Sequence, residues 1–118
     1  MKTEELINRT KDFAHRCVKL AISLPKSDLG NHIRRQLIRC STSVAANYRA
    51  TVLAQSDAAF ISKLSIVLEE IDESAFWLEF IIDENLIPKV KIEQLFTEAN
   101  ELKAIFYSAR KTMKKKNS

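Results

Sequence analysis

The sequence predicts an all-α protein that folds as an antiparallel, up-down-up-down four-helix bundle, in one domain over residues 1–118. The first observation behind this prediction is that the 118 residues include only one glycine and two prolines, whereas average usage would give roughly 8 and 6. The second is that apolar residues recur at helical spacing between three short breaks in the chain. Strands joined by hairpins need clusters of turn residues, so this composition argues against a sheet protein. The breaks lie at residues 25–28, 55–57 and 85–88.

The helices that we expect around these breaks cover residues 3–24, 28–55, 57–83 and 90–114. Their short connections force neighbouring helices to run antiparallel. The first helix has one apolar stripe, which consists of Leu6, Phe13, Cys17, Leu20 and Leu24. This stripe is typical of a helix that packs one face into a bundle.

The second expected helix has two opposed sides. Its apolar side, within a sector of about 80°, consists of Ile33, Leu37, Cys40, Val44, Tyr48 and Thr51. Its basic side consists of His32, Arg35, Arg39 and Arg49. Polar Ser43 and Asn47 lie on one flank of the apolar side.

The third expected helix is apolar on two sides. Its core stripe consists of Phe60, Leu64, Val67, Leu68, Ile71, Ala75, Leu78 and Ile82. On the opposite side, the apolar residues Ile66, Trp77 and Phe80 surround Glu73. A helix that is apolar on two sides must be covered on both, so we expect these four residues to form an oligomer interface. The alternative is a wider core with a rotated helix.

The fourth expected helix alternates steps of three and four from Ile92 through Leu102 to Met113, which is a sustained heptad pattern. Residues 110–118 read as a fraying helix end and a short basic tail. Its cations are Arg110, Lys111, Lys114, Lys115 and Lys116. They either bind an anionic partner or simply complement the negative end of the helix dipole.

Charge is distributed unevenly along the chain. Residues 1–56 carry ten basic and four acidic side chains, residues 57–84 carry one and eight, and residues 85–118 carry eight and three. The basic segments are candidates for binding nucleic acid, because arginine side chains on one helix face can meet phosphates with paired hydrogen bonds. The alternative is that the arginines of the second helix pair with the acidic third helix.

The two cysteines and the N-terminal segment give an expectation about the compartment. Two cysteines are too few for a disulfide scaffold and match no zinc spacing, so we expect Cys17 and Cys40 to be reduced core residues. No apolar signal peptide precedes the first helix, and no uncharged run is long enough to span a membrane. We therefore expect a cytoplasmic protein with no membrane partner.

The sequence offers little support for catalysis. It contains no nucleophile motif and no phosphate-binding glycine loop, because one glycine cannot build one. Asp12 and His15 form a single Asp-x-x-His pair, whereas a di-iron bundle needs two Glu-x-x-His pairs that face inward. We expect no enzymatic activity, no cofactor and no metal, and a metal-dependent enzyme that uses Asp12, His15 and acidic residues of the third helix is the disfavoured alternative.

Two long motifs carry a family resemblance. Residues 36–50, QLIRCSTSVAANYRA, and residues 60–74, FISKLSIVLEEIDES, resemble the bacterial four-helix-bundle family that includes proteins encoded in 23S rRNA intervening sequences. The Leu-Pro-Lys break at 24–26, the Trp-Leu-Glu at 77–79 and the Asn-Leu-Ile at 85–87 are also similar to that family.

The resemblance implies a ring-like homopentamer, with a distant fold relation to the accessory proteins of diversity-generating retroelements, which bind nucleic acid and a reverse transcriptase. It implies no enzymatic activity. It also implies that Ser43 and Asn47 make polar contacts between helices or subunits. We therefore expect a homo-oligomer that binds RNA or other structured nucleic acid through the basic side of the second helix and the tail. The alternative function is a protein-interaction scaffold or an accessory subunit, for example of a reverse transcriptase.

Overall fold

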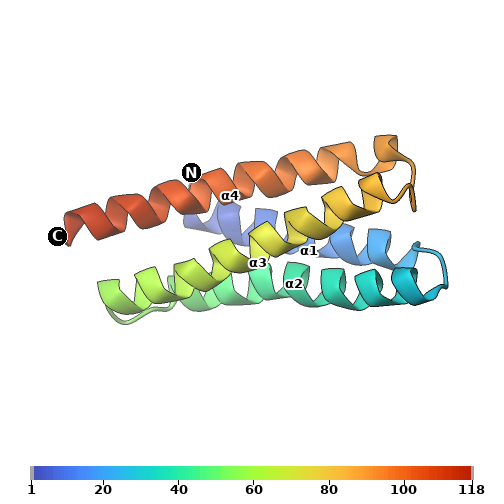
Figure 1. Ribbon diagram of the computed structural model, residues 1–118. Coiled ribbons are helices and arrows are strands. Elements are labelled where there is room, and N and C mark those ends of the chain that lie inside the picture. The colour runs from blue at the N-terminus through green and yellow to red at the C-terminus, as the bar shows by residue number, and fades with distance from the viewer. Residues whose placement is uncertain (1, 118) are drawn as a thin grey trace.

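The computed structural model describes residues 2–117, which contain four α-helices and no strand. The helices are α1 (Thr3–Ile22), α2 (Asp28–Val52), α3 (Asp57–Asp83) and α4 (Glu93–Lys116), and a 3-10 turn, η1 (Lys89–Lys91), precedes α4. Consecutive helices run antiparallel, in an up-down-up-down bundle of 47 × 23 × 20 Å (Figure 1). The predicted all-α four-helix bundle is confirmed.

The helices pack in chain order, so that α2 lies between α1 and α3, and α3 lies between α2 and α4. The contact between α1 and α4 is much the smallest of the four side-by-side contacts. The last turns of α4 extend beyond the first turn of α1 (Figure 1). The C-terminal end of α4 is therefore covered less than the rest of the bundle.

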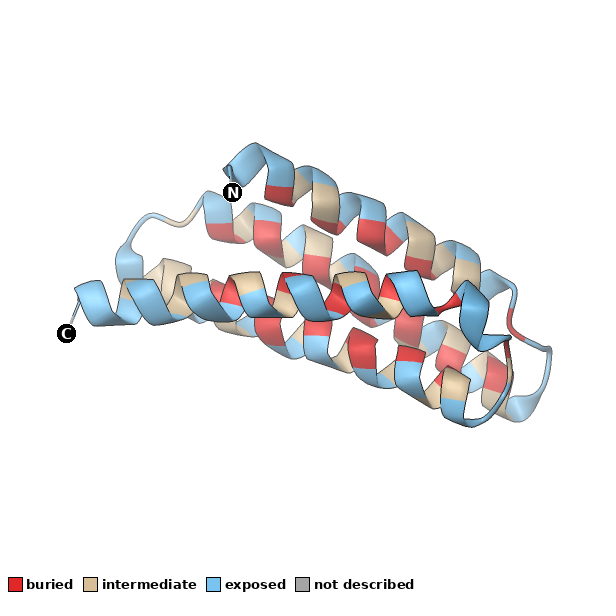
Figure 2. Ribbon diagram, turned by 90° about the horizontal axis from the view of Figure 1, so that it is seen from above, coloured by how far each residue is buried: buried red, intermediate tan, exposed pale blue. Residues whose placement is uncertain are grey.

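The core follows the inner sides of all four helices (Figure 2). Its largest fully buried side chains include Phe13, Ile33, Leu37, Leu64, Ile71, Leu78, Ile81, Ile92, Leu102 and Phe106. The rings of Tyr48 and Phe106 meet with their centroids 5.1 Å apart. Two positions of the predicted stripe of α3, Phe60 and Ile82, are only half-buried, whereas Ile81, outside that stripe, is fully buried. The reason is that α3 packs against both α2 and α4, which widens its buried arc beyond a single stripe.

The turn between α1 and α2 depends on the one glycine of the chain. Ser27 caps α2 by accepting a hydrogen bond from the Gly30 amide at 3.0 Å. A Cβ at Gly30 would lie 1.9 Å from the carbonyl oxygen of Pro25, so only glycine allows this approach. The Arg34 guanidinium donates to the Leu24 carbonyl at 2.7 Å and satisfies the end of α1. This cation therefore has a structural role.

The other helix ends differ from the predicted ones by a few residues. Helix α2 ends at Val52 rather than at residue 55, and Ser56 caps α3 by accepting from the Ala59 amide at 3.1 Å. Helix α4 begins at Glu93 rather than at residue 90, because the carbonyl of Pro88 accepts from the Lys91 amide in the 3-10 turn. It then continues through Lys116, so the expected fraying tail is helical up to that residue.

Both cysteines are buried and free, as predicted for reduced core residues. The Ser74 hydroxyl donates to Cys40 Sγ at 3.2 Å. Burial is the main cause that raises the pKa of Cys40 to about 11, and burial raises the pKa of Cys17 as well. The two thiols are thus held in the unreactive, protonated form at neutral pH.

Candidate functional site

The basic side predicted for α2 is divided between its two neighbouring helices. Arg39 turns to α3, where Nη1 donates to Glu70 Oε2 at 3.0 Å and Nη2 donates to Glu73. His32 also turns to α3, and its ring meets the Trp77 ring edge-on with the centroids 5.5 Å apart. The pairing of α2 cations with the acidic third helix, raised as an alternative from the sequence, therefore occurs at Arg39.

Glu73 connects α2 to the aromatic residues of α3. Its carboxylate accepts hydrogen bonds from Arg39 and, at 3.2 Å, from Trp77 Nε1. Burial alone would raise the pKa of Glu73, but these two hydrogen bonds and the charge of Arg39 outweigh burial and leave the pKa below its ordinary value. Glu73 is thus ionised at neutral pH and engaged within its own chain.

Arg35 and Arg49 are exposed, and neither makes a side-chain hydrogen bond or an ion pair with residues 2–117. The two side chains do not share one surface. Arg49 lines a groove between α1 and α2 with a volume of about 430 Å³, whereas Arg35 does not line it. The apolar lining of this α1–α2 groove consists of Ile7, Ala14, Val18, Ala45 and Ala46. Its charged or titratable lining consists of Lys11, His15 and Arg49. The groove thus combines an apolar lining with basic groups.

The C-terminal turns of α4 present cations around an exposed aromatic ring. Tyr107 is 55% exposed, and the Arg110 guanidinium lies 5.8 Å from its ring centroid. Arg110 also donates to Ser65 Oγ at 3.3 Å, while Lys111 and Lys114 line the same shallow pocket. None of these three cations forms an ion pair with a carboxylate of residues 2–117. We refer to Tyr107, Arg110, Lys111 and Lys114 as the basic end of α4.

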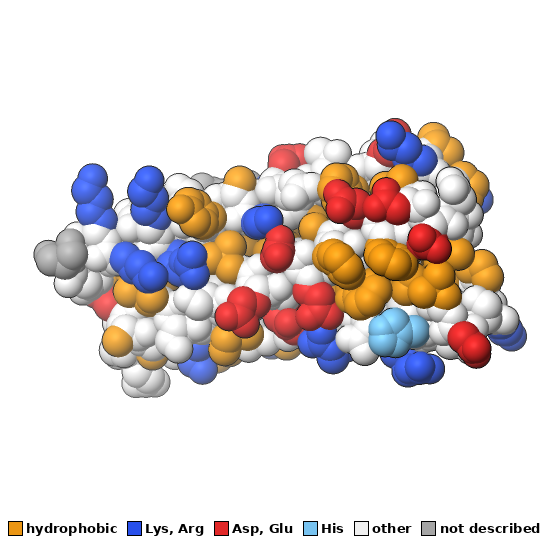
Figure 3. Space-filling view, viewed as in Figure 1, with side chains coloured by type: hydrophobic (Ala, Val, Ile, Leu, Met, Phe, Trp, Pro, Cys, Tyr) orange, Lys and Arg blue, Asp and Glu red, His pale blue; other side chains and the backbone are white. Residues whose placement is uncertain are grey.

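Figure 3 shows how these charges are distributed over one face of the molecule. Lys and Arg side chains gather toward the end of the molecule where α4 ends, whereas acidic side chains are concentrated nearer the middle. A hydrophobic patch occupies the other half of the same face, with acidic side chains at its border. Cationic and apolar surfaces are therefore separated along the bundle.

The residues of α3 predicted as an oligomer interface differ in how far they are exposed. Ile66 is 41% exposed, whereas Trp77 and Phe80 are half-buried and pack against the core of their own chain. Phe76, which the sequence did not single out, is 51% exposed and meets the Trp77 ring with the centroids 5.0 Å apart. We refer to Ile66, Phe76, Trp77 and Phe80 as the outer side of α3. The wider core, given as the alternative from the sequence, occurs at Trp77 and Phe80, whereas the oligomer interface stays a prediction.

Ser43 and Asn47 bond to each other along α2. Asn47 Nδ2 donates to the carbonyl oxygen of Ser43 at 2.9 Å and to its Oγ at 2.8 Å. Both residues are half-buried. The polar contact to another subunit that the resemblance implies for them stays a prediction.

Two further sequence expectations concern metals and membranes. Asp12 faces Arg16 Nη1 at 3.6 Å, and no group of three or more His, Cys, Asp or Glu side chains in residues 2–117 is placed to hold a metal ion. None of the helices in this part of the chain is long and apolar enough to cross a membrane.

Residues 2–108 match the protein family described as 23S rRNA-intervening sequence protein. This chain belongs to that family. Its structure is similar to the crystal structure of a protein with unknown function from the S23 ribosomal protein family of Bacteroides thetaiotaomicron. The two chains are 32% identical, the similarity covers 94% of this chain and 99% of the other, and the TM-score is 0.85. None of the curated proteins matches this chain.

The family resemblance stated from the sequence is thereby confirmed for nearly the whole chain. In this member of the 23S rRNA-intervening sequence protein family, the matched segment contains the residues that form the Arg39–Glu73 ion pair, the α1–α2 groove and the outer side of α3. Three of the four residues of the basic end of α4 follow the matched segment, namely Arg110, Lys111 and Lys114.

The sequence analysis did not identify two exposed aromatic residues, Tyr107 and Phe76, although the spacing of their neighbours could have predicted that they are exposed. Tyr107 precedes Arg110 by three residues and Lys111 by four, which places all three on one helical face. Phe76 adjoins Trp77, and an unbroken pair of aromatic residues on a helix must point in two directions.

Proposed function

We propose that this chain is a non-enzymatic, cytoplasmic homo-oligomer that binds RNA or other structured nucleic acid through the basic end of α4. The observation that carries this proposal is that Arg110, Lys111 and Lys114 lie beside the exposed Tyr107 ring without a carboxylate partner in residues 2–117. Unpaired cations attract phosphates. An exposed aromatic ring offers a surface on which a base stacks.

Two further observations support this choice of surface. Arg39, predicted from the sequence to contact nucleic acid, is already paired with two carboxylates of α3 and offers little to a phosphate. The name of the matching family refers to 23S rRNA, and the name of the similar solved protein's family refers to the ribosome. RNA is therefore the first ligand to test.

The test replaces two cations of the basic end of α4 and measures RNA binding over a range of salt concentrations. Lys111→Gln with Lys114→Gln should weaken binding of a structured RNA roughly tenfold. Loss of two phosphate contacts should also flatten the slope of log K against log salt by about 1.4. The matched control, Lys89→Gln with Lys103→Gln, removes the same charge from lysines that face carboxylates of α3 and α4. Equal binding by the two double variants would contradict the proposal.

We further propose that the outer side of α3 packs into the α1–α2 groove of another copy. The exposed Phe76 lies near the acidic residues Asp72 and Glu79, which line a shallow groove with it. The α1–α2 groove offers an apolar lining with basic groups, so the two surfaces are complementary in both charge and polarity. Because the two surfaces differ, the contact is heterologous and closes into a ring when the rotation permits. A ring is also what the family resemblance implies, with a pentamer as the expected size.

This contact is tested by altering the groove without touching the core. Ala46 is exposed and lines the groove, so Ala46→Glu should fill it, repel the acidic outer side of α3 and lower the mass measured by light scattering toward 13.5 kDa. The matched control is Ala58→Glu, at an exposed alanine of α3 outside both surfaces. A wild-type monomer, or equal masses for the two variants, would count against self-association here.

The second candidate function is a protein-interaction scaffold or an accessory subunit, and the exposed ring of Phe76 favours it. In that case the outer side of α3 serves a different protein, and the chain is monomeric in isolation. Partner capture that survives nuclease treatment and is lost in Phe76→Ser would support this function over RNA binding.

A further inference from the structure

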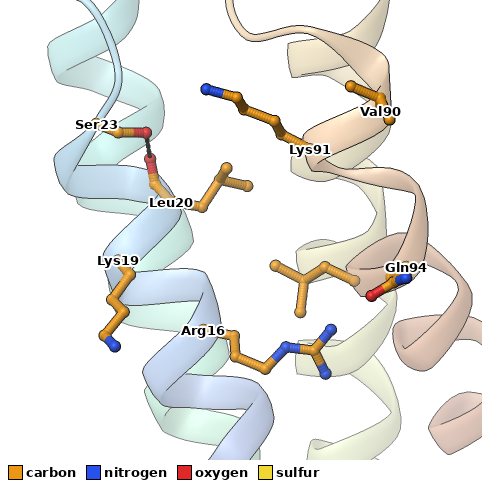
Figure 4. A pocket seen from close by; sticks show the side chains of 8 residues that line it. Arg16, Lys19, Leu20, Ser23, Val90, Lys91 and Gln94 are labelled. Atoms are coloured by element: carbon orange, nitrogen blue, oxygen red, sulfur yellow. Dashed lines mark hydrogen bonds between the residues drawn. The ribbon is translucent and has the colours of Figure 1, made fainter.

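A second cationic pocket lies at the opposite end of the bundle from the basic end of α4. It is formed by the last turns of α1, by η1 and by the first turn of α4, and has a volume of about 310 Å³ (Figure 4). None of its cations, Arg16, Lys19 and Lys91, was singled out from the sequence. It lies between α1 and α4, whose contact is the smallest of the four side-by-side helix contacts.

The pocket combines an apolar lining with cations from two sides. Leu20 points from α1 into the space in Figure 4, and Leu95 of α4, which is buried, also lines it. Arg16 extends from α1 toward Gln94, and Lys91 extends from η1 toward the opposite wall (Figure 4). A ligand in this space would therefore meet a cation on each side and an aliphatic surface between them.

The positive charge of the pocket is poorly neutralised. No carboxylate lines the pocket, and the ammonium groups of Lys19 and Lys91 have no ion pair with residues 2–117. Arg16 faces a single carboxylate, that of the exposed Asp12 at 3.6 Å, which is a weak contact in water. Helix α4 begins beside the pocket without a side-chain cap, so the positive end of its dipole adds to the cations.

We propose that this pocket binds the phosphomonoester group of a nucleotide, with the phosphate between Arg16 and Lys91 and the base against Leu20. A phosphomonoester carries a charge of about −1.5 to −2 at neutral pH, which suits a pocket lined by several cations better than the single charge of a backbone diester does. The pocket volume of about 310 Å³ lies at the lower end of the range of roughly 300–1,000 Å³ for small-molecule sites. The group belongs either to the phosphorylated end of an RNA strand, which rests on the proposed function, or to a free mononucleotide.

The experiment compares ligands that differ only in this phosphate, with the full-length chain. A short single-stranded RNA with a 5′-phosphate should bind about tenfold tighter than the same RNA with a 5′-hydroxyl. AMP should bind and adenosine should not. Arg16→Gln and Lys91→Gln should each abolish the preference for the phosphate, whereas the matched control Lys89→Gln, two residues away in the same turn, should keep it. Circular dichroism checks that the variants fold.

The outcomes separate this inference from the proposed function. Equal binding of both RNAs, with no AMP binding, overturns the phosphate pocket and leaves RNA binding by α4 intact. AMP binding that requires Lys91, without RNA binding, supports the pocket for a free nucleotide and overturns the proposed function. A phosphate preference that survives both Arg16→Gln and Lys91→Gln overturns the pocket, because the phosphate then binds elsewhere.

Discussion

The outer side of α3 and the basic end of α4 each expose one large aromatic ring, but the charges around the two rings differ. Phe76 and Tyr107 are similarly exposed, at 51% and 55%. Asp72, Glu79 and Lys103 share a shallow groove with Phe76, and Lys103 is paired with Asp72. Arg39 of α2 is bound by Glu70 and Glu73 of α3. Cations lie beside Tyr107, and none of Arg110, Lys111 and Lys114 has a carboxylate partner in residues 2–117.

We propose that this difference decides which partner each surface accepts. Beside Phe76, Asp72 is paired with Lys103, whereas Glu79 has no ion pair with residues 2–117. The surface therefore offers an exposed apolar ring and one free carboxylate, which favours a protein surface with basic groups. Cations that are left without partners attract phosphates, and the adjacent ring adds stacking. The total charge of the chain does not distinguish the two surfaces, whereas the pairing of individual side chains does.

The largest expected effect is a difference in the free energy of unfolding between variants of Trp77 and of its neighbour Phe76. Trp77 is half-buried and packs against the core, so Trp77→Ala should lower the free energy of unfolding by about 2–3 kcal/mol. Phe76→Ala should lower it by only about 0.5 kcal/mol, because the ring is largely exposed. Urea denaturation of both variants measures this, and equal losses would mean that Phe76 belongs to the core and offers no free surface.

A smaller effect concerns the ion pair that holds α2 to α3. The pKa of Glu73 is lower in the folded chain than in the unfolded one, so its contribution to stability is complete above the unfolded pKa and is lost as the pH falls through the folded pKa. Glu73→Gln should cost about 0.5–1 kcal/mol at pH 7, in the range of exposed ion pairs. The difference from wild type should shrink below about pH 4. Denaturation curves at several pH values test this, and a difference that is independent of pH would exclude an ionised Glu73 as its source.

The fold was predictable because its signals are local. The helical period and the three breaks lie in the sequence itself, and the caps at Ser27 and Ser56 follow from residue type. The exact first residue of α4 could not be predicted, because a 3-10 turn that follows Pro88 precedes the α-helix. Which isoleucine of α3 enters the core was also missed, since Ile81 is buried by packing on two helices at once.

The candidate sites were less predictable, because they depend on how the helices are rotated against one another. The sequence placed Arg35, Arg39 and Arg49 on one side of α2, but whether each meets α3, α1 or solvent depends on packing. The pocket at the other end of the bundle joins Arg16 of α1 to Lys91 of η1, which no local pattern brings together. The sequence therefore identified basic and apolar regions of the helices, but it could not tell which cations lack a carboxylate partner. That either region binds a partner stays a prediction.

The central claim is that the charges around an exposed ring decide its partner, and one paired measurement tests it directly. Tyr107→Ser and Phe76→Ser make a similar change at two similarly exposed rings. We predict that Tyr107→Ser weakens binding of a short RNA about fivefold or more, from the loss of one stacked base, and leaves the oligomer mass unchanged. Phe76→Ser should leave binding of the short RNA unchanged and lower the mass. Equal weakening of RNA binding by the two variants would contradict the claim.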